Sequence, residues 1–310
     1  MKQYDIIGDI HGHAAELKEL LLNLGYKRSG YGFRHNERKI VFVGDFIDRG
    51  PANAEVIQIA RAIVEDGNGY AVMGNHEYNA IAFHTRRPES TEFFRDRTEK
   101  NREQHQETLD QLSNQEMRDA ILWFKTLPVA IEFDDFRVAH ASWQTRDIQS
   151  IETGFATLGR FTTDFMASAC DPTNPLCRAI ENILKGPELQ LPKGHSFFDK
   201  GGHQRFSTRV RWYTDSTGMT LQDYSIGAGD NLPEGGVPND PKLKIDHYLP
   251  AERPVFFGHY WLQGIPMPFA SNVACVDYSV AKEGKLCAYQ WRPGETILNA
   301  NRYAWVDAKA

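Results

Sequence analysis

The chain has 310 residues and a formal net charge of −6, with 41% hydrophobic and 25% charged residues. These values are typical of globular proteins and exclude a chain dominated by disorder or low complexity. The acidic balance excludes an overall basic field that would attract nucleic acid or an anionic membrane surface. The start lacks a signal peptide's apolar run, and no stretch reaches the roughly 18 apolar residues of a membrane span. We therefore expect a soluble, cytoplasmic protein.

The first part of the chain alternates short β-rich runs with helical patterns. Strands are predicted at 4–8, 39–43 and 70–73, and amphipathic helices at 14–24 and 52–65. Glycine-containing loops join these elements. Strands that alternate with helices in this way are typical of a layered α/β fold.

The next elements are less regular. Residues 85–107 carry six basic and six acidic residues, which indicates a solvated helical surface or a lid without a binding role. Residues 108–127 have a helical pattern that ends before Pro128. A hairpin is predicted across residues 129–139, and it delivers His140 at its end.

Glycine and proline accumulate in the second half of the chain, and residues 143–250 are predicted to form an irregular insertion or cap. The tail returns to apolar strands at 254–257, 272–276 and 285–291. The four cysteines include no Cys-x-x-Cys pair, which favours reduced thiols, with a Cys170–Cys177 disulfide as the alternative.

Polar side chains follow five of the predicted strands. Residues 8–12 read Gly-Asp-Ile-His-Gly and residues 44–50 read Gly-Asp-Phe-Ile-Asp-Arg-Gly. The other three loops lie at 74–77, 138–141 and 256–260. The carboxyl ends of strands in open α/β sheets are where ligands bind. We expect side chains that bind metal ions directly at these loops: Asp9, His11, Asp45, Asn75, His140 and His259.

This mixed oxygen and nitrogen set contains no thiolate, and it suits Mn, Fe, Zn or Co better than Ca or Mg. Two ions in one site need a bridging ligand, and Asp45 is our choice for it. Mn is the preferred expectation for both divalent ions, with Fe, Zn, Co or Ni as alternatives.

The motifs at 8–12, 44–50 and 74–77 stand in one order along the chain, and any one of them alone would be a weak signal. Together they resemble the calcineurin-like metallophosphoesterases, and among these the serine/threonine-type phosphoprotein phosphatases of bacterial type. The resemblance covers residues 3–140 and 254–291. It implies an α/β sandwich of two mixed sheets flanked by helices, forming one catalytic domain over residues 1–310 with 143–250 as the cap.

The resemblance also implies roles for single residues. One metal is expected on Asp9, His11 and Asp45, and the other on Asp45, Asn75, His140 and His259. A hydroxide that bridges the two ions would attack phosphorus. His76 would protonate the leaving group, Asp48 would orient the His76 imidazole and keep it protonated, and Arg49 would clamp the phosphate. A second phosphate-binding cation is expected in the cap, and its candidates are Arg209, Arg211 and Lys185.

Each assignment has a simpler structural alternative. Asp9 could cap a helix, Asp48 and Arg49 could form only a turn, and His140 and His259 could be buried histidines without a ligand role. Asp277 could accept a hydrogen bond from a histidine near the metals, or it could form a turn at the end of a strand. The remaining histidines are predicted to be surface or loop residues, and four aromatic residues are predicted to pack: His13, His35, His84, His105, His195, His203 and His247; Trp212, Tyr213, Tyr260 and Trp261.

The predicted function is hydrolysis of phosphomonoesters, with dinucleoside polyphosphate hydrolysis as the alternative within the enzyme class. The substrate class is a phosphorylated small molecule, a nucleotide or a phosphoprotein, and neither nucleic acid nor a membrane is an expected partner. A metal-retaining binding protein without catalysis is the alternative from another class. That class would have lost His76 or Asp48, and both are present.

Overall fold

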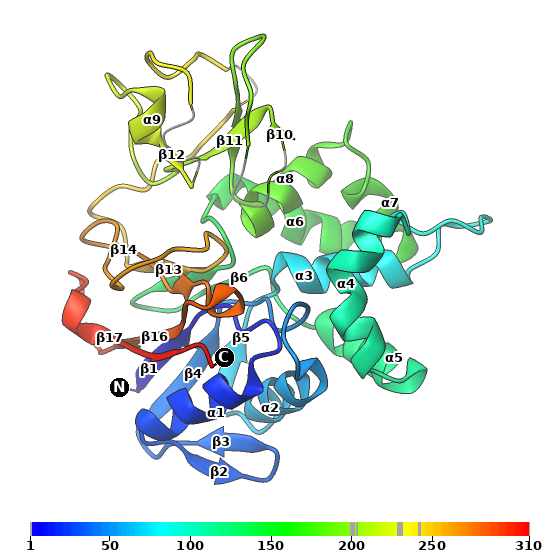
Figure 1. The fold of residues 1–310 in the computed structure, drawn as a ribbon, viewed down its shortest axis with the longest axis vertical. Helices are drawn as coiled ribbons and strands as arrows, with labels where there is room; N and C mark the ends of the chain where they lie inside the picture. The colour runs from blue at the N-terminus through cyan, green and yellow to red at the C-terminus, as the bar shows by residue number, and fades with distance from the viewer. Residues whose placement is uncertain (1, 199–201, 203, 228–231, 241–242, 310) are drawn as a thin grey trace.

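The structure is a computed structural model that describes residues 2–198, 202, 204–227, 232–240 and 243–309. Two mixed β-sheets lie at its centre (Figure 1). The first sheet has six strands, with the order β15-β16-β1-β4-β5 and with β17 also paired to β16. Its strands are Gln3–Ile7 (β1), Arg38–Phe42 (β4), Gly69–Ala71 (β5), Asp277–Tyr278 (β15), Lys285–Trp291 (β16) and Tyr303–Asp307 (β17).

The second sheet has four strands, in the order β14-β13-β7-β6. The strands are Ala130–Glu132 (β6), Arg137–Ala139 (β7), Val255–Phe257 (β13) and Val273–Cys275 (β14). β13 pairs in parallel with both β7 and β14, whereas β6 and β7 form the predicted antiparallel hairpin. Because β7 and β13 are parallel neighbours, His140 and His259 leave the sheet at the same edge.

Alternation along the strands divides the core into layers. Val41 of β4 packs against Phe136, Val138 and Phe256 between the two sheets. Ile40 and Phe42 point to the opposite face, into the core formed with the helices Ala14–Asn23 (α1) and Asn53–Glu65 (α2). Successive side chains of a strand face opposite sides, so one strand serves both layers. The predicted sandwich of two mixed sheets with flanking helices is confirmed.

The prediction of one helix over 108–127 is wrong. The chain instead forms the helices Glu99–Gln111 (α4) and Asn114–Phe124 (α5). Ser113 separates them, because its hydroxyl accepts from the Glu116 N–H at 3.3 Å while the Glu116 carboxylate accepts from the Ser113 N–H at 2.9 Å. This reciprocal pair starts a new helix and explains the break.

Residues 143–185 are regular rather than irregular. They form the helices Thr145–Leu158 (α6), Thr163–Ala169 (α7) and Pro175–Lys185 (α8). Their buried apolar side chains belong to the same core cluster as those of α1 and α2. Loop signals such as Gly159 and Pro175 separate the helices, and they mask the helical pattern in the sequence.

Residues 188–250 make a smaller unit, which we call the cap (Figure 1). It contains the strands Glu188–Gln190 (β8), Phe197–Phe198 (β9), Gln204–Arg205 (β10), Ser207–Val210 (β11) and Ser225–Ile226 (β12) and the helix Leu221–Tyr224 (α9). A separate apolar cluster that includes Leu189, Val210 and Leu221 holds it together. Buried Trp212 packs on Phe257 of the second sheet, with ring centroids 5.3 Å apart. We propose that the insertion begins at the cap rather than at residue 143.

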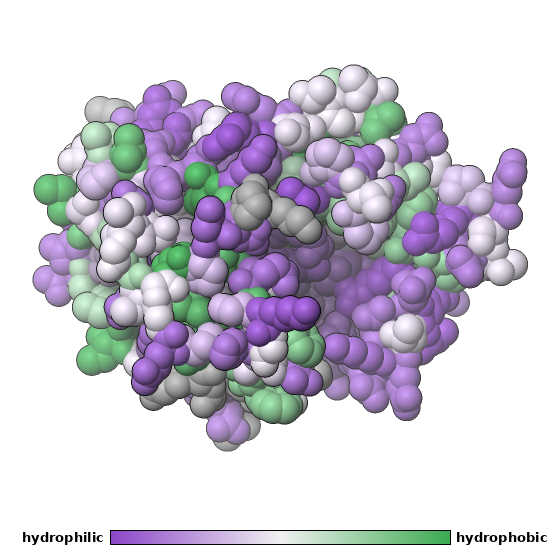
Figure 2. Space-filling model, turned by 90° about the horizontal axis from the view of Figure 1, so that it is seen from above, coloured by the Kyte–Doolittle hydropathy of each residue, from purple (hydrophilic) through white to green (hydrophobic). Residues whose placement is uncertain are grey.

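The remaining described elements are the hairpin strands Lys27–Ser29 (β2) and Gly32–Arg34 (β3), the helix Asn75–His84 (α3) and the short 3-10 helices Val280–Lys282 (η1) and Ala300–Arg302 (η2). The four cysteines are free, so the alternative of a Cys170–Cys177 disulfide is not formed. Among the described residues, no helix is both long enough and apolar enough to cross a membrane. Figure 2 looks down on the cap end and shows a mostly hydrophilic face with a recess near its centre.

Candidate metal centre

The six predicted ligands come from both sheets and meet at one set of strand ends. Asp9 and His11 follow β1, Asp45 follows β4, and Asn75 begins α3. His140 and His259 follow β7 and β13 of the second sheet. All six side chains are buried, with relative exposures from 0% to 7%.

The Asp45 carboxylate lies between two groups of possible ligands. Its Oδ2 lies 3.6 Å from His11 Nε2 and 3.4 Å from His140 Nε2. Asp45, His11 and His76 form one group of ligand atoms within 4.8 Å of one another, and Asp45, His140 and His259 form the other. A carboxylate common to two such groups has the position that a bridging ligand requires.

Several of these groups point unused lone pairs into the site. Asp9 Oδ1, His11 Nε2 and both ring nitrogens of His259 are buried and have no hydrogen-bond partner. The His11 Nδ1–H donates to the Ile47 carbonyl at 2.9 Å, and the His140 Nδ1–H donates to the Val43 carbonyl at 2.7 Å. These bonds aim each Nε2 inward, as in histidines that bind metals. Because unpaired buried polar groups are costly, the residues fit divalent cations.

The charges at the site also favour cation binding. Burial, together with the carboxylates of Asp277 and Asp45, raises the pKa of Asp9 well above its usual value. Burial and the neighbouring His76 lower the pKa of His11 to about 3, which makes its imidazole neutral. A neutral His11 imidazole beside crowded carboxylates leaves a negative charge that a cation would balance.

Left-handed backbone is concentrated in the loops that carry the site. Positive φ angles occur at His11 (47°), Asp45 (53°) and His259 (72°), and also at Asp48, Arg49 and Trp261. Such conformations cost free energy in residues other than glycine and cluster at functional sites. Two glycines also allow close approach: a Cβ on Gly74 would lie 2.2 Å from Asp45 Oδ1, and one on Gly258 would lie 1.9 Å from Asp9 Oδ1.

Two further carboxylates hold these loops in place. Glu77 is fully buried and accepts from the Asp45 and Phe46 N–H groups at 2.9 and 2.8 Å. Asp277 accepts from the Trp261 N–H at 2.6 Å and from the Ser279 N–H at 2.9 Å. Asp277 therefore begins β15, forms a turn with Ser279 and fixes the loop after His259. Within the described part of the chain, its side chain makes no hydrogen bond to a histidine.

The predicted acid–base pair is assembled beside the ligands. His76 Nδ1 lies 2.5 Å from Asp48 Oδ2, and His76 Nε2 lies 4.0 Å from Asp45 Oδ2. The other oxygen of Asp48 contacts two residues that sequence reasoning missed, because His105 Nδ1 lies 2.7 Å away and Thr108 Oγ1 lies 2.6 Å away. His105 is buried on α4, so its assignment to the surface or a loop is wrong.

Two cationic side chains lie on Trp261, whose ring centroid is 6.2 Å from that of His11. The exposed guanidinium of Arg49 stacks on Trp261, 3.9 Å from the ring centroid, and Lys282 lies 4.5 Å from the same centroid. Trp261 is partly exposed, unlike the predicted packing residues Trp212, Tyr213 and Tyr260, which are buried. An arginine held flat on an indole keeps its donor edge free for an anion.

The three predicted candidates for a second phosphate-binding cation are in different environments. Lys185 is paired with Glu181 at 2.7 Å. Arg211 donates from Nη1 to the Tyr213 hydroxyl at 3.4 Å. Arg209 on β11 forms no ion pair within the described parts of the chain, and its charge acts on His259 and Tyr260. Arg209 therefore has the cation that is most available to a substrate.

The family model for calcineurin-like phosphoesterases matches residues 3–164. The chain belongs to this family. The resemblance predicted from the motifs is thereby confirmed, and so is the expectation of a phosphoesterase enzyme. Phosphoesterases of this family use divalent metals, and the two groups around Asp45 offer possible ligands for them.

Relatives of this phosphoesterase match part of its sequence. A bis(5'-nucleosyl)-tetraphosphatase PrpE (asymmetrical) from Oceanobacillus iheyensis is 48% identical over 73 residues, which are 23% of this chain and 29% of the relative. The chain thus spans under a third of that relative's length. A protein of the same name from Halalkalibacterium halodurans is 45% identical over 75 residues, 24% of this chain and 30% of the relative.

A solved structure supports the fold alone. A crystal structure described as a candidate diadenosine tetraphosphatase aligns with 99% of this phosphoesterase and 94% of its own chain, with a TM-score of 0.50 and 18% sequence identity.

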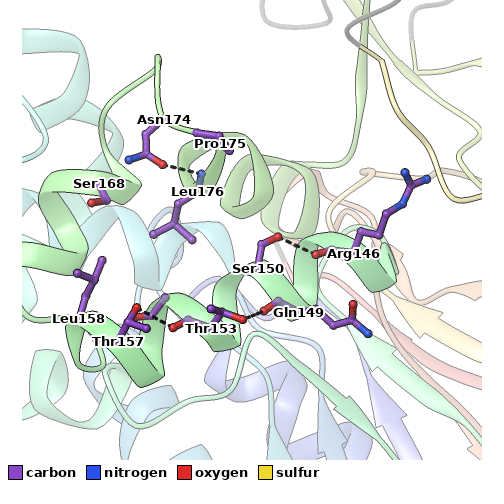
Figure 3. A pocket seen from close by; sticks show the side chains of 11 residues that line it. Arg146, Gln149, Ser150, Thr153, Thr157, Leu158, Ser168, Asn174, Pro175 and Leu176 are labelled. Carbon is purple, nitrogen blue, oxygen red and sulfur yellow. Dashed lines mark hydrogen bonds between the residues drawn. The ribbon is translucent and has the colours of Figure 1, made fainter.

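A separate pocket of about 630 Å³ lies between α6 and the start of α8 (Figure 3). The residues that line it include Ser150, Thr153 and Asn174. None of the residues that line it belongs to the candidate metal groups of this phosphoesterase. The pocket is therefore distinct from the two groups of possible ligands around Asp45.

Proposed function

We propose that this chain hydrolyses phosphate esters or phosphoanhydrides with two divalent cations. The observation that carries the proposal is the position of Asp45 between the two ligand groups, with its Oδ2 3.6 Å from His11 Nε2 and 3.4 Å from His140 Nε2. In this proposal Asp9, His11 and Asp45 hold one cation, and Asp45, Asn75, His140 and His259 hold the other. The bound cations would polarise the phosphate and activate water.

His76 is close enough to His11 and Asp45 to be considered as a ligand, so its role needs an argument. Its Nδ1–H donates to the Asp48 carboxylate, which orients the imidazole ring. Asp9, by contrast, has a buried Oδ1 with no hydrogen-bond partner. We therefore assign Asp9 as the ligand and His76 as the acid that delivers a proton from Nε2 to the leaving oxygen.

Arg49 and Arg209 are our candidates for binding substrate phosphate. Stacking on Trp261 limits the freedom of the Arg49 guanidinium without using its N–H donors. Arg209 lies on β11 of the cap, so it would approach the substrate from a different part of the chain than Arg49 does. A planar guanidinium can donate two parallel hydrogen bonds to phosphate oxygens.

For the substrate, the partial relatives favour the second of our two sequence-based hypotheses. Their name places bis(5'-nucleosyl) tetraphosphates ahead of simple monoesters as the class to test first. Lys282 and Arg49 on the same indole also offer two cations to a substrate that carries several phosphates. Monoesters remain the second candidate, because the ligand set and the His76–Asp48 pair serve either leaving group. Mn is still the preferred metal and the cytoplasm the preferred location.

The test is metal-dependent turnover. The protein is stripped with chelator, reloaded with Mn, Co, Ni, Zn, Fe or Mg, and assayed on diadenosine tetraphosphate, p-nitrophenyl phosphate and a phosphopeptide. We expect transition metals to restore hydrolysis and His76→Asn to reduce it by roughly 10²-fold or more. A protein that binds two ions but turns over no substrate with any metal would contradict the proposal and favour a binding protein.

A further inference from the structure

The Asp48 carboxylate is held from two sides. Its Oδ2 accepts from His76 on α3 at 2.5 Å, and its Oδ1 lies 2.7 Å from His105 Nδ1 on α4. Thr108, one turn further along α4, donates from Oγ1 to the same Oδ1 at 2.6 Å and accepts from the Asp48 N–H at 3.0 Å. We propose that His105 and Thr108 are positioning residues that fix Asp48 so that His76 can protonate the leaving group. This inference rests on the proposed role of His76.

An aspartate needs partners on both carboxylate oxygens because its carboxylate rotates easily. The terminal torsion of this side chain is broad, so a carboxylate with one partner can rotate and take that partner with it. Three hydrogen bonds to two oxygens remove this freedom from Asp48. The backbone of Asp48 is also left-handed, with φ at 71°, and Thr108 ties its N–H to α4. Displacements of about 1 Å at a catalytic group can cost about 10²-fold in rate.

Burial makes these contacts specific. Asp48 is 3% exposed, His105 5% and Thr108 0%, so water does not compete for the hydrogen bonds. The hydrogen bonds from His105 and His76 hold the pKa of Asp48 well below its usual value, even though burial opposes ionisation. The carboxylate is therefore an anion that accepts all three bonds, and each donor that is removed leaves an incompletely held charge.

The far side of His105 is fixed as well. Its Nε2 lies 3.2 Å from Nε2 of His84, the last residue of α3. The Phe83 ring packs on His105 with centroids 5.3 Å apart. The His105 ring therefore has a partner at each nitrogen and a packed face, which sets its tautomer and its direction toward Asp48.

Matched variants separate positioning from mere folding. His105→Leu and Thr108→Val each remove the hydrogen-bond donor to Asp48. His105→Asn and Thr108→Ser each retain a donor at that position. Each protein is loaded with Mn and assayed on phenyl phosphate and on p-nitrophenyl phosphate, whose leaving group departs more readily without a proton. We expect the first two variants to lower kcat on phenyl phosphate by on the order of 10-fold with little change in KM. The loss on p-nitrophenyl phosphate should be several-fold smaller, and the conservative variants should recover most activity.

A readout without turnover accompanies the assay. In the metal-free protein, the ring N–H resonance of His76 reports its bond to Asp48, and we expect His105→Leu to shift or broaden it. A separate titration with Mn should show that His105→Leu still binds two ions. Equal losses on the two esters, or no loss, would overturn the inference. If His105→Leu does not fold, the comparison of Thr108→Val with Thr108→Ser in the same assays tests the inference, because both substitutions nearly preserve the volume of the side chain. A wild-type protein without metal-dependent turnover would instead refute the proposed function, and the resonance would still test the positioning.

Discussion

The ligand loops and helix α4 serve the same site but differ in how their sequences relate to their structures. Asp9 and His11 lie two residues apart in a loop that begins directly after β1. His105 and Thr108 lie in a polar helix far along the chain from Asp48, with 57 and 60 positions between the partners. The loops place their ligands through local backbone geometry, whereas α4 reaches the site only through tertiary packing.

This difference explains what the sequence could predict. The position of a metal ligand depends on the residues next to it in sequence, because glycines and left-handed residues such as His11 and Asp45 shape the loop that carries it. Contiguous residues therefore reveal it as a motif. A helical side chain that supports a carboxylate needs only the correct face of the helix. In α4 that face carries two buried polar residues in a helix that is polar almost throughout, and no local pattern distinguishes them.

The fold follows the same division. The strands that precede motif loops, such as β1 and β4, were predicted within one or two residues, because apolar runs end at glycines. The helices α6–α8 were missed, because breaks at their ends hid their periodicity. The split at Ser113 was also missed, although its capping box with Glu116 is a local signal that could have revealed it.

The strongest test of the comparison is the replacement of the shared ligand. We expect Asp45→Asn to weaken the binding of both cations and to reduce turnover on the order of 10³-fold, because both groups lose their common charge. Calorimetric titration with Mn measures the stoichiometry and affinity. The exposed Asp66→Asn is the matched control. Two unchanged binding events in Asp45→Asn would remove the basis for a bridging role.

A cap residue should affect substrate binding without affecting the metals. We expect Arg209→Gln to raise KM about 10-fold, the scale of a charge-assisted hydrogen bond, with metal binding unchanged. Arg211→Gln is the control from the same segment, since its guanidinium contacts Tyr213. Equal KM values for the wild type and Arg209→Gln, measured with saturating Mn, would exclude Arg209 as a phosphate contact.

A smaller effect is expected at Trp261. Trp261→Leu removes the ring under Arg49 but keeps the guanidinium, so we expect KM to rise about threefold while kcat changes little. Trp261→Phe retains an aromatic face and should show an intermediate KM. A collapse of kcat in Trp261→Leu would show that the ring acts through His11, 6.2 Å away, rather than through Arg49.

The smallest expected effect is on the pH dependence of stability, and it comes from His84, the last residue of α3. Burial and the neighbouring His105 and Arg97 lower the pKa of His84 from its ordinary 6.5 to about 4. Between these values the unfolded chain binds the proton more readily than the folded one, so stability falls as pH falls from 6.5 to 4. We expect His84→Gln to flatten this dependence in urea unfolding followed between pH 4.5 and 7. Parallel curves for the two proteins would contradict the assignment.

The hydrogen bond from the His259 N–H to Asp9 Oδ2, at 3.0 Å, has a consequence for biosynthesis because it joins positions 250 residues apart. A ribosome delivers Asp9 early and His259 only after most of the chain has emerged. In our ligand assignment, a nascent chain offers the second cation an incomplete set until then. Chains that end before His259 would therefore carry the early motifs but lack a closed dinuclear centre, so we expect hydrolysis only from chains that extend past this residue.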